Sequence, residues 1–427
     1  MITSDQLSWA RARQQQSGGL VGVLIGAGIV SRADLVAATA ERPTAIKGIT
    51  PGGSRDATPR GGLDGLLADV VRVGGSDLHL SAGRPPAVRV NGEIRAIEDQ
   101  QVLTPDAIRG LVLGVLSAGE RARFEEDLEL DTSYTARDVG RFRVNVFLQR
   151  QAMGAVLRAI PFDIPRFASL GLPASVAALA QAHRGLVLVT GPTGSGKSTT
   201  LASLVDIVNQ ERAGHIVTVE DPIEFIHQHK RSVVSQREVG QDTRSFAAAL
   251  KHVLRQDPDV ILVGEMRDLE TIATALTAAE TGHLVLGTLH TQSAAQSVER
   301  MTDVFPGHQQ QQVRAQLSTT LRGIVTQQLV PAIGGGRVVA AEVLVATNAV
   351  RALVRDGKTH QIASSMQSGA RQGMQTMDHC LAALVRERRI DANVALEHCH
   401  DQDDFRRLLG TAAASVTSPP LSSAGRR

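Results

Sequence analysis

The chain has 427 residues, which is more than a single hydrophobic core usually organises, so two or three domains are expected. Hydrophobic residues make up 42% of it. Its 45 basic and 43 acidic residues nearly balance, and aromatic residues make up only 3%. Proteins that bind nucleic acid typically carry a basic excess and aromatic stacking platforms. The composition therefore argues against nucleic acid as a partner.

The cysteine content points to reduced thiols. Cys380 and Cys399 are too few and too far apart for a disulfide framework or a four-thiolate zinc site. No segment approaches the ~20 apolar residues that are needed to cross a bilayer. We therefore expect a cytoplasmic protein whose membrane contact comes only through partners.

The first part of the chain predicts a helical hairpin at residues 1–45. Ser4 and Ser31 stand where helix N-caps are expected, with a glycine-rich apolar run between the two helices. Proline and glycine then predict a linker at residues 46–62.

Residues 63–165 predict a small α+β domain. Apolar and polar residues alternate in three short runs, as they do on half-buried strands, and Asn91-Gly92 predicts a hairpin turn. The last of these runs places Arg141, Arg143 and Asn145 on one strand face.

Residues 166–345 predict strands that alternate with helices. The expected strands are residues 186–189, 215–219, 260–263 and 284–287. Such an alternation is typical of βαβ units in a mostly parallel sheet, whose ligand site lies at the carboxyl ends of the strands. Residues 346–410 have helical periodicity, and the Ala/Ser/Pro-rich tail at 411–427 is expected to be disordered.

The most informative stretch is GPTGSGKS, which fits the phosphate-binding pattern G-x-x-x-x-G-K-[ST] between an expected strand and an expected helix. Its glycines let backbone N–H groups point at phosphate oxygens, and the helix start adds a positive dipole end. Lys197 is expected to reach the β- and γ-phosphates, and the Ser198 hydroxyl to hold Mg²⁺. The expected nucleotide-binding residues are Gly191, Pro192, Thr193, Gly194, Ser195, Gly196, Lys197, Ser198 and Thr199.

Carboxylates follow two of the other strands. Glu265 ends the run VILVGE, where phosphate-loop enzymes place an acid that binds Mg²⁺ through water or orients the attacking water. Glu220, Asp221 and Glu224 follow another strand and could share the Mg²⁺ shell, or form a solvated acidic turn before a proline.

Two histidines flank the strand expected at residues 284–287. His283 precedes it and His290 follows it. They could sense the γ-phosphate or a subunit interface, although a histidine is more often structural.

Several long segments closely resemble the retraction ATPases of type IV pili (PilT-like), within the type II/IV secretion ATPase superfamily. They are GPTGSGKSTT, VEDPIEF, VSQREVGQDT, ILVGEMRDLETI, LTAAETGHLVLGTLHT and GMQTMD, with SDLHLSAGRPPAVRVNGEI earlier in the chain. The resemblance implies an α/β fold with a RecA-like P-loop core, a smaller PAS-like α+β amino-terminal domain and a helical carboxyl-terminal region. It also implies a hexameric, ATP-driven ring.

The resemblance also implies roles for single residues. Residues 191–199 resemble the Walker A loop, Glu224 the catalytic acid of the Asp box, Glu265 the Walker B glutamate, and His283 and His290 the His box. Arg141 and Arg143 resemble arginines of the amino-terminal domain that approach nucleotide, and Arg158 is a third candidate; a solvated strand face is the alternative.

Residues 349–355, AVRALVR, resemble the family's retraction motif A-I-R-N-L-I-R with three changes. Val350 and Val354 stand for Ile, and Ala352 stands for Asn, so that one side-chain amide is lost.

Two departures from the family pattern bear on the branch. Assembly and secretion relatives carry a four-cysteine zinc module, which two distant cysteines cannot build. Residues 1–60 resemble half of the helical domain of assembly-type ATPases, and we expect them to dock a partner or to be a vestigial cap.

These observations predict a hexameric ATPase that uses ATP and Mg²⁺ to drive pilus retraction against an inner-membrane platform protein. The alternatives are an accessory retraction ATPase and a pilus-assembly or type II secretion ATPase. A RecA-like nucleic-acid translocase is disfavoured by the balanced charge, and a non-catalytic nucleotide switch by the intact Lys197, Ser198 and Glu265.

Overall fold

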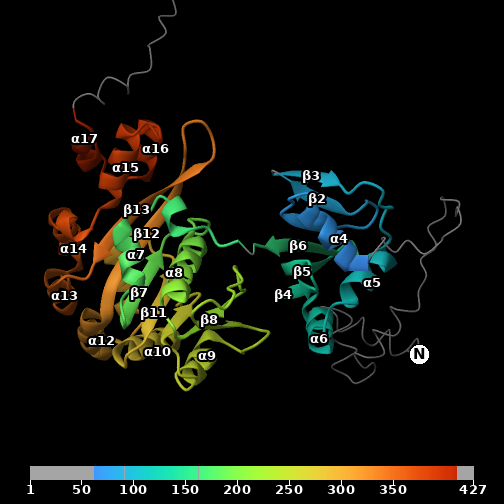
Figure 1. Ribbon diagram of the computed structural model, residues 1–427, viewed down its shortest axis with the longest axis horizontal. Coiled ribbons are helices and arrows are strands. Elements are labelled where there is room, and N and C mark those ends of the chain that lie inside the picture. Colours follow the sequence, from blue (N-terminus) through green and yellow to red (C-terminus); the bar gives the residue numbers. More distant parts are fainter. Residues whose placement is uncertain (1–61, 91, 162, 411–427) are drawn as a thin grey trace, which may run out of the picture. The chain divides into compact units, whose positions relative to one another are not determined.

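A computed structural model describes residues 62–90, 92–161 and 163–410. The helical hairpin expected at residues 1–45, nearly all of the linker expected at 46–62, and the tail expected at 411–427 lie outside the described residues. The described chain builds two sheets (Figure 1).

The first sheet is antiparallel and has six strands in the order β3-β2-β1-β6-β5-β4. The strands are β1 (Asp77–Leu80), β2 (Ala87–Val90), β3 (Glu93–Ala96), β4 (Glu129–Ala136), β5 (Gly140–Gln149) and β6 (Ala152–Ile160). The accompanying helices are α4 (Gly62–Arg72), α5 (Pro105–Leu113) and α6 (Ala118–Asp127). The expected small α+β domain is present.

One hydrophobic core joins these helices to the sheet. Leu66 and Leu67 of α4 pack in the same cluster as Phe142 and Val144 of β5. The alternation expected on β5 is confirmed, because Phe142 and Val144 are buried while Arg141 and Arg143 share the other face.

The second sheet has seven strands in the order β13-β12-β7-β11-β10-β8-β9. The strands are β7 (Gly185–Thr190), β8 (His215–Glu220), β9 (Val233–Glu238), β10 (Val260–Val263), β11 (Leu284–Leu289), β12 (Leu321–Pro331) and β13 (Arg337–Val345). All neighbouring pairs are parallel except β12 with β13. The expected parallel α/β core is therefore confirmed.

Helices cover both faces of this sheet (Figure 1). They are α7 (Ala174–Ala180), α8 (Lys197–Glu211), α9 (Phe246–Val253), α10 (Leu269–Glu280), α11 (Ala294–Asp303) and α12 (Gly307–Thr320). Every residue of β7 is buried; Leu186 and Leu188 pack with α9 to α12, whereas Val187 and Val189 pack with α7 and α8. A strand apolar on both faces is what a two-sided parallel sheet requires.

The β12–β13 hairpin was not anticipated from the sequence. Polar residues Thr326, Gln327 and Gln328 interrupt the apolar pattern of β12, yet Thr326 and Gln327 are buried. β9 was also missed, because its sequence VVSQRE carries four polar residues in succession. Both strands are fixed by pairing with a neighbour rather than by their own periodicity.

The carboxyl-terminal region is helical, as expected. Its helices are α13 (Asn348–Arg355), α14 (Ile362–Ser368), α15 (Met377–Arg386), α16 (Ala392–His398) and α17 (Gln402–Leu409). Short 3₁₀ turns lie at Phe167–Ser169, Thr359–Gln361 and Ala370–Gln372. Among the helices of the described ranges, none combines the length and the apolar character that a membrane span requires.

Candidate active site

The glycine-rich loop has the expected strand before it and the expected helix after it. β7 ends at Thr190 and α8 begins at Lys197, so residues 191–196 form the connection. Gly191 has φ +137°, and a Cβ there would lie 2.2 Å from the carbonyl oxygen of Gln327. Only glycine fits this backbone conformation and this close approach of β12.

Lys197 is the first residue of α8, and its ammonium lies within the loop. Its Nζ donates hydrogen bonds to the carbonyl oxygens of Gly191 (2.9 Å) and Pro192 (3.0 Å). Burial lowers the pKa of Lys197, and the nearby charges of Glu265 and Glu224 oppose that shift. These two hydrogen bonds hold the ammonium inside the loop.

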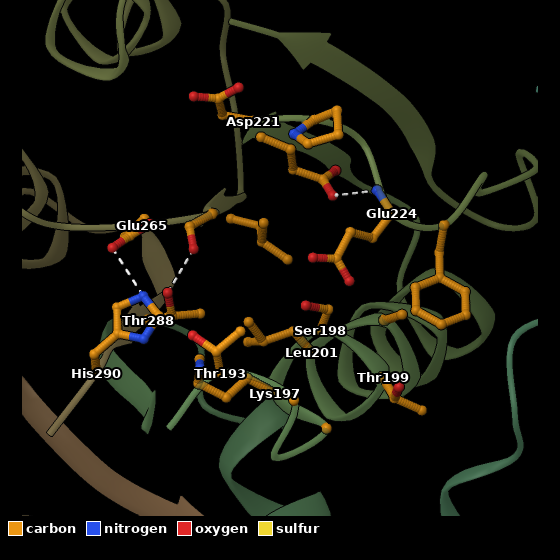
Figure 2. Close-up of a pocket in the computed structure, with 18 of the residues that line it drawn as sticks. Thr193, Lys197, Ser198, Thr199, Leu201, Asp221, Glu224, Glu265, Thr288 and His290 are labelled. Carbon is orange, nitrogen blue, oxygen red and sulfur yellow. Dashed lines mark hydrogen bonds and ion pairs between the residues drawn. The ribbon is translucent and has the colours of Figure 1, made fainter. Parts of the chain in front are cut away.

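A cavity of about 400 Å³ opens over this loop at the carboxyl ends of the parallel strands (Figure 2). It is lined by the loop, by the predicted acids and by side chains from β11, β12 and β13. The predicted site residues that line it are Thr193, Gly194, Gly196, Lys197, Ser198, Thr199, Glu220, Asp221, Glu224, Glu265 and His290. A cavity of this size, lined by both polar and apolar side chains at the carboxyl ends of parallel strands, suits a nucleotide.

Glu265 lies just beyond β10, and two nitrogen atoms contact its carboxylate. His290 Nε2 is 2.9 Å from Glu265 Oε1, and Arg267 Nε donates to the same oxygen. The other carboxylate oxygen, Oε2, makes no hydrogen bond to the described part of the chain, so it can accept one from water. This arrangement fits the water-orienting role expected of Glu265.

The acids at the end of β8 and just after it differ in their surroundings. Glu220 accepts hydrogen bonds from Thr218 Oγ1 (2.7 Å) and the Glu224 backbone N–H (3.3 Å), and burial raises the pKa of Glu220 to about 7. Burial also raises the pKa of Asp221. Figure 2 shows the Glu224 carboxylate directed toward Ser198, whereas Asp221 points away from it.

A Mg²⁺ ion fits only part of the predicted ligand set. Ser198 at the start of α8 and the carboxylate of Glu224 face each other across the cavity (Figure 2). Within the ranges that the structure describes, no group of three or more His, Cys, Asp or Glu side chains is arranged as a metal site. Protein ligands to Mg²⁺ are commonly few, because phosphate oxygens and water complete its shell.

The two predicted histidines lie at opposite ends of β11. His290 lines the cavity, whereas His283 precedes Leu284 at the amino end of the strand. His283 Nδ1 lies 3.0 Å from the Ala278 carbonyl oxygen, at the carboxyl end of α10. A six-residue parallel strand separates the two by about 20 Å, so His283 is outside the cavity of its own chain.

None of the three predicted arginines is among the residues that line the cavity. Arg141 Nη2 donates to Ser133 Oγ (2.8 Å) and forms an ion pair with Glu238 (3.0 Å). Arg158 pairs with Asp77 at 2.7 Å. Arg143 is 4.0 Å from Asp131. Their contact with nucleotide stays a prediction.

The β12–β13 hairpin contributes residues that sequence reasoning missed. Gln327 is buried, and its Nε2 donates to the Ser195 carbonyl oxygen (2.7 Å) while its Oε1 accepts from Thr200 Oγ1 (3.0 Å). Leu329 and Arg337 line the cavity. The only sequence signal for this hairpin was the run Gly334-Gly335-Gly336 before Arg337, which predicts a turn but gives no sign of a ligand contact.

Comparisons with known proteins agree with this geometry. The family described as "Type II/IV secretion system protein" matches residues 66–377. The "Type IV pilus retractation ATPase PilT" of Pseudomonas aeruginosa is 49% identical over 340 residues, which are 80% of this chain and 98% of that protein. The "Type IV pilus ATPase PilU" of the same organism is 44% identical over 82% of this chain and 92% of its own length.

A solved structure is similar as well. It is the "Crystal Structure of the Pilus Retraction Motor PilT and Bound ADP", with a TM-score of 0.76 and 50% identity. The match covers 81% of this chain and 98% of that one. At this identity and coverage the likeness extends to the amino-terminal domain as well as to the RecA-like core.

Proposed function

Since this chain belongs to the type II/IV secretion system ATPase family, we propose that it is the ATP-hydrolysing motor of type IV pilus retraction. The chain is an ATPase with an amino-terminal α+β domain and a RecA-like core. The observation that carries the proposal is that Lys197, Glu265 and His290 face one cavity at the carboxyl ends of the parallel strands.

The chemistry follows from these positions. Lys197 and the backbone N–H groups of the loop hold the phosphates and neutralise the charge that develops on them. Glu265, oriented by His290 and Arg267, accepts a hydrogen bond from the attacking water. Ser198 and Glu224 would hold Mg²⁺, which supplies further charge neutralisation when bound.

Coupling to movement rests on the loss of the phosphate. The cavity is lined by residues from loop, strand ends and hairpin, so a nucleotide binds several segments at once. Loss of the γ-phosphate removes part of the contact that the nucleotide makes between these segments, and it favours a different arrangement of them. In a ring of six copies, sequential hydrolysis would then turn or ratchet an inner-membrane platform protein from the cytoplasmic side.

The helix α13 supports the assignment to retraction. It carries the segment that resembles the retraction motif, with Thr347 as N-cap. Val350 and Val354 are buried, whereas Arg351 Nε donates to the Ala346 carbonyl oxygen (3.0 Å) and Arg355 pairs with Asp356. The substitution by Ala352 leaves this helix intact.

The assay compares a strain that lacks the gene with the same strain expressing wild type or Lys197→Ala. Pilus retraction is followed by microscopy of labelled pili. Restoration by wild type and not by the variant is expected. Normal retraction in the deletion strain would contradict the proposal.

A second function is an accessory retraction ATPase, because the chain also resembles a second pilus ATPase of Pseudomonas aeruginosa, PilU, at 44% identity. Hydrolysis by the purified full chain, measured alone and mixed with the second retraction ATPase of the same organism, separates the two. Full turnover alone supports the main motor, and turnover only in the mixture supports the accessory one.

A further inference from the structure

The β12–β13 hairpin forms a wall of the cavity to which no role has been assigned. β12 pairs with β7 on the side opposite to β11, so β7 separates the hairpin from the strands that carry Glu265 and His290. The sheet order therefore gives the cavity two ends, with the predicted hydrolytic residues at one and the hairpin at the other.

The hairpin is fixed to the phosphate-binding loop. Gln327 bonds to Ser195 and to Thr200, on either side of Lys197. A Cβ built on Gly196 would lie 3.1 Å from Gln327 Nε2 and 3.9 Å from Leu329 Cδ1. The wall thus stands directly over the point where the loop becomes α8.

Arg337 lies next to the turn of the β12–β13 hairpin. It is the first residue of β13 and pairs across the hairpin with Pro331, which ends β12. Three glycines with positive φ, Gly334 to Gly336, precede it. The side chain of Arg337 is exposed and lines the cavity. Its guanidinium forms no hydrogen bond or ion pair with the described residues.

The charges of the cavity leave a place for this cation. Four carboxylates line it (Glu220, Asp221, Glu224 and Glu265), whereas the only lysine and arginine side chains in the described lining are Lys197 and Arg337. Lys197 is held inside the loop, where the β- and γ-phosphates are expected. The α-phosphate of the same nucleotide must lie farther along the loop, toward the start of α8 and the hairpin.

We propose that the guanidinium of Arg337 binds the α-phosphate of the nucleotide, from the side of the cavity opposite to Glu265. A guanidinium matches phosphate oxygens with two parallel N–H donors, which an ammonium does not. This inference rests on the proposed ATPase function and adds a binding residue to the same site.

The test measures dissociation constants of the full chain for ADP by calorimetry, and for AMP and adenosine by competition with fluorescent ADP. Arg337→Ala is expected to weaken ADP and AMP by about 10- to 100-fold and to leave adenosine unchanged. Arg337→Lys is expected to recover only part of the loss. Ile333→Ala, an exposed change on the same hairpin that lies outside the cavity lining, is the matched control.

Each outcome decides between the possibilities. Equal affinities for ADP in wild type and Arg337→Ala would overturn the inference, and so would an equal loss for adenosine, because the contact would then be with the nucleoside. A wild-type chain that binds no nucleotide would instead overturn the ATPase function. Equal melting temperatures of all variants verify that the fold is kept.

Discussion

His290 Nε2 lies 2.9 Å from Oε1 of Glu265, which joins the carboxyl ends of two neighbouring parallel strands. Arg267 contacts the same oxygen, so one side of the carboxylate is fixed and the other is left for water. Positioning of this kind raises turnover without adding to nucleotide affinity.

His290→Ala is therefore expected to lower kcat by roughly 10- to 100-fold with little change in the dissociation constant for ADP. Phosphate release under saturating ATP measures the first quantity and calorimetry the second. His308→Ala, an exposed histidine at the start of α12, serves as the control. An equal loss in affinity would mean that His290 binds nucleotide directly.

Glu265→Gln tests the acid itself. The amide keeps the shape but cannot accept a proton or draw water as a carboxylate does, so hydrolysis should fall by roughly 10²- to 10⁴-fold. The variant should still bind ATP, because Lys197 and the loop are untouched. Rapid-quench turnover of pre-bound ATP gives the rate, and an unchanged rate would remove Glu265 from the mechanism.

Lys197→Ala should lower turnover by roughly 10²- to 10³-fold or more while the fold stays intact. The lysine contacts only carbonyl oxygens of its own loop, so its loss leaves the sheet and both cores in place. The measurements are phosphate release and a thermal melt. Turnover near the wild-type value would refute the assignment of the loop.

Gln327→Leu removes the two hydrogen bonds that join β12 to Ser195 in the phosphate-binding loop and to Thr200 in α8. It leaves the Ser195 carbonyl and the Thr200 hydroxyl without this partner, which should lower the free energy of unfolding by roughly 1–3 kcal/mol. Nucleotide affinity should fall as well, since the loop loses its support. Denaturant titration and ADP calorimetry measure the two effects.

Gln328→Ala is the neighbouring control for this prediction. The Gln328 side chain contacts His398 rather than the loop, so ADP affinity should stay unchanged. An equal loss of affinity in both variants would show that the strand as a whole, and not the Gln327 amide, sets the loop.

His227 predicts a dependence of stability on pH. Burial lowers the pKa of His227 to about 4 from the usual 6.5, and its Nδ1 has no hydrogen-bond partner in the described chain. Between these values the unfolded state binds a proton that the folded state does not. The contribution of neutral His227 to the free energy of unfolding should therefore be fully present above pH 6.5. It should be lost as the pH drops toward 4, which lowers the free energy of unfolding by about 3 kcal/mol.

His227→Phe should lack this component, so that the difference in unfolding free energy between variant and wild type grows as the pH falls from 6.5 to 4. Denaturant titrations without nucleotide across that range measure it. A constant difference would show that His227 does not carry the dependence.

Local pattern was enough to predict much of the core. The phosphate-binding loop needs a strand, three glycines, a lysine and a helix in succession, and all of these are consecutive in the sequence. The same holds for β10 and Glu265, because a short apolar run followed by an acid places that acid at the carboxyl end of a buried strand. The strands β7 and β10 and the helix α8 could thus be predicted without knowledge of what packs against them, and the structure confirms them.

Tertiary structure decided what contacts this loop and which candidates come together. The pairing of β12 with β7 brings Gln327 and Arg337 to residues 191–200, more than a hundred positions earlier in the chain, and no periodicity records such a pairing. His283 and His290 look alike in sequence, yet the six residues of β11 place them at opposite ends of that strand. Motifs within one segment are set by local geometry, whereas contacts between segments depend on which strands pair, and that is a property of the whole fold.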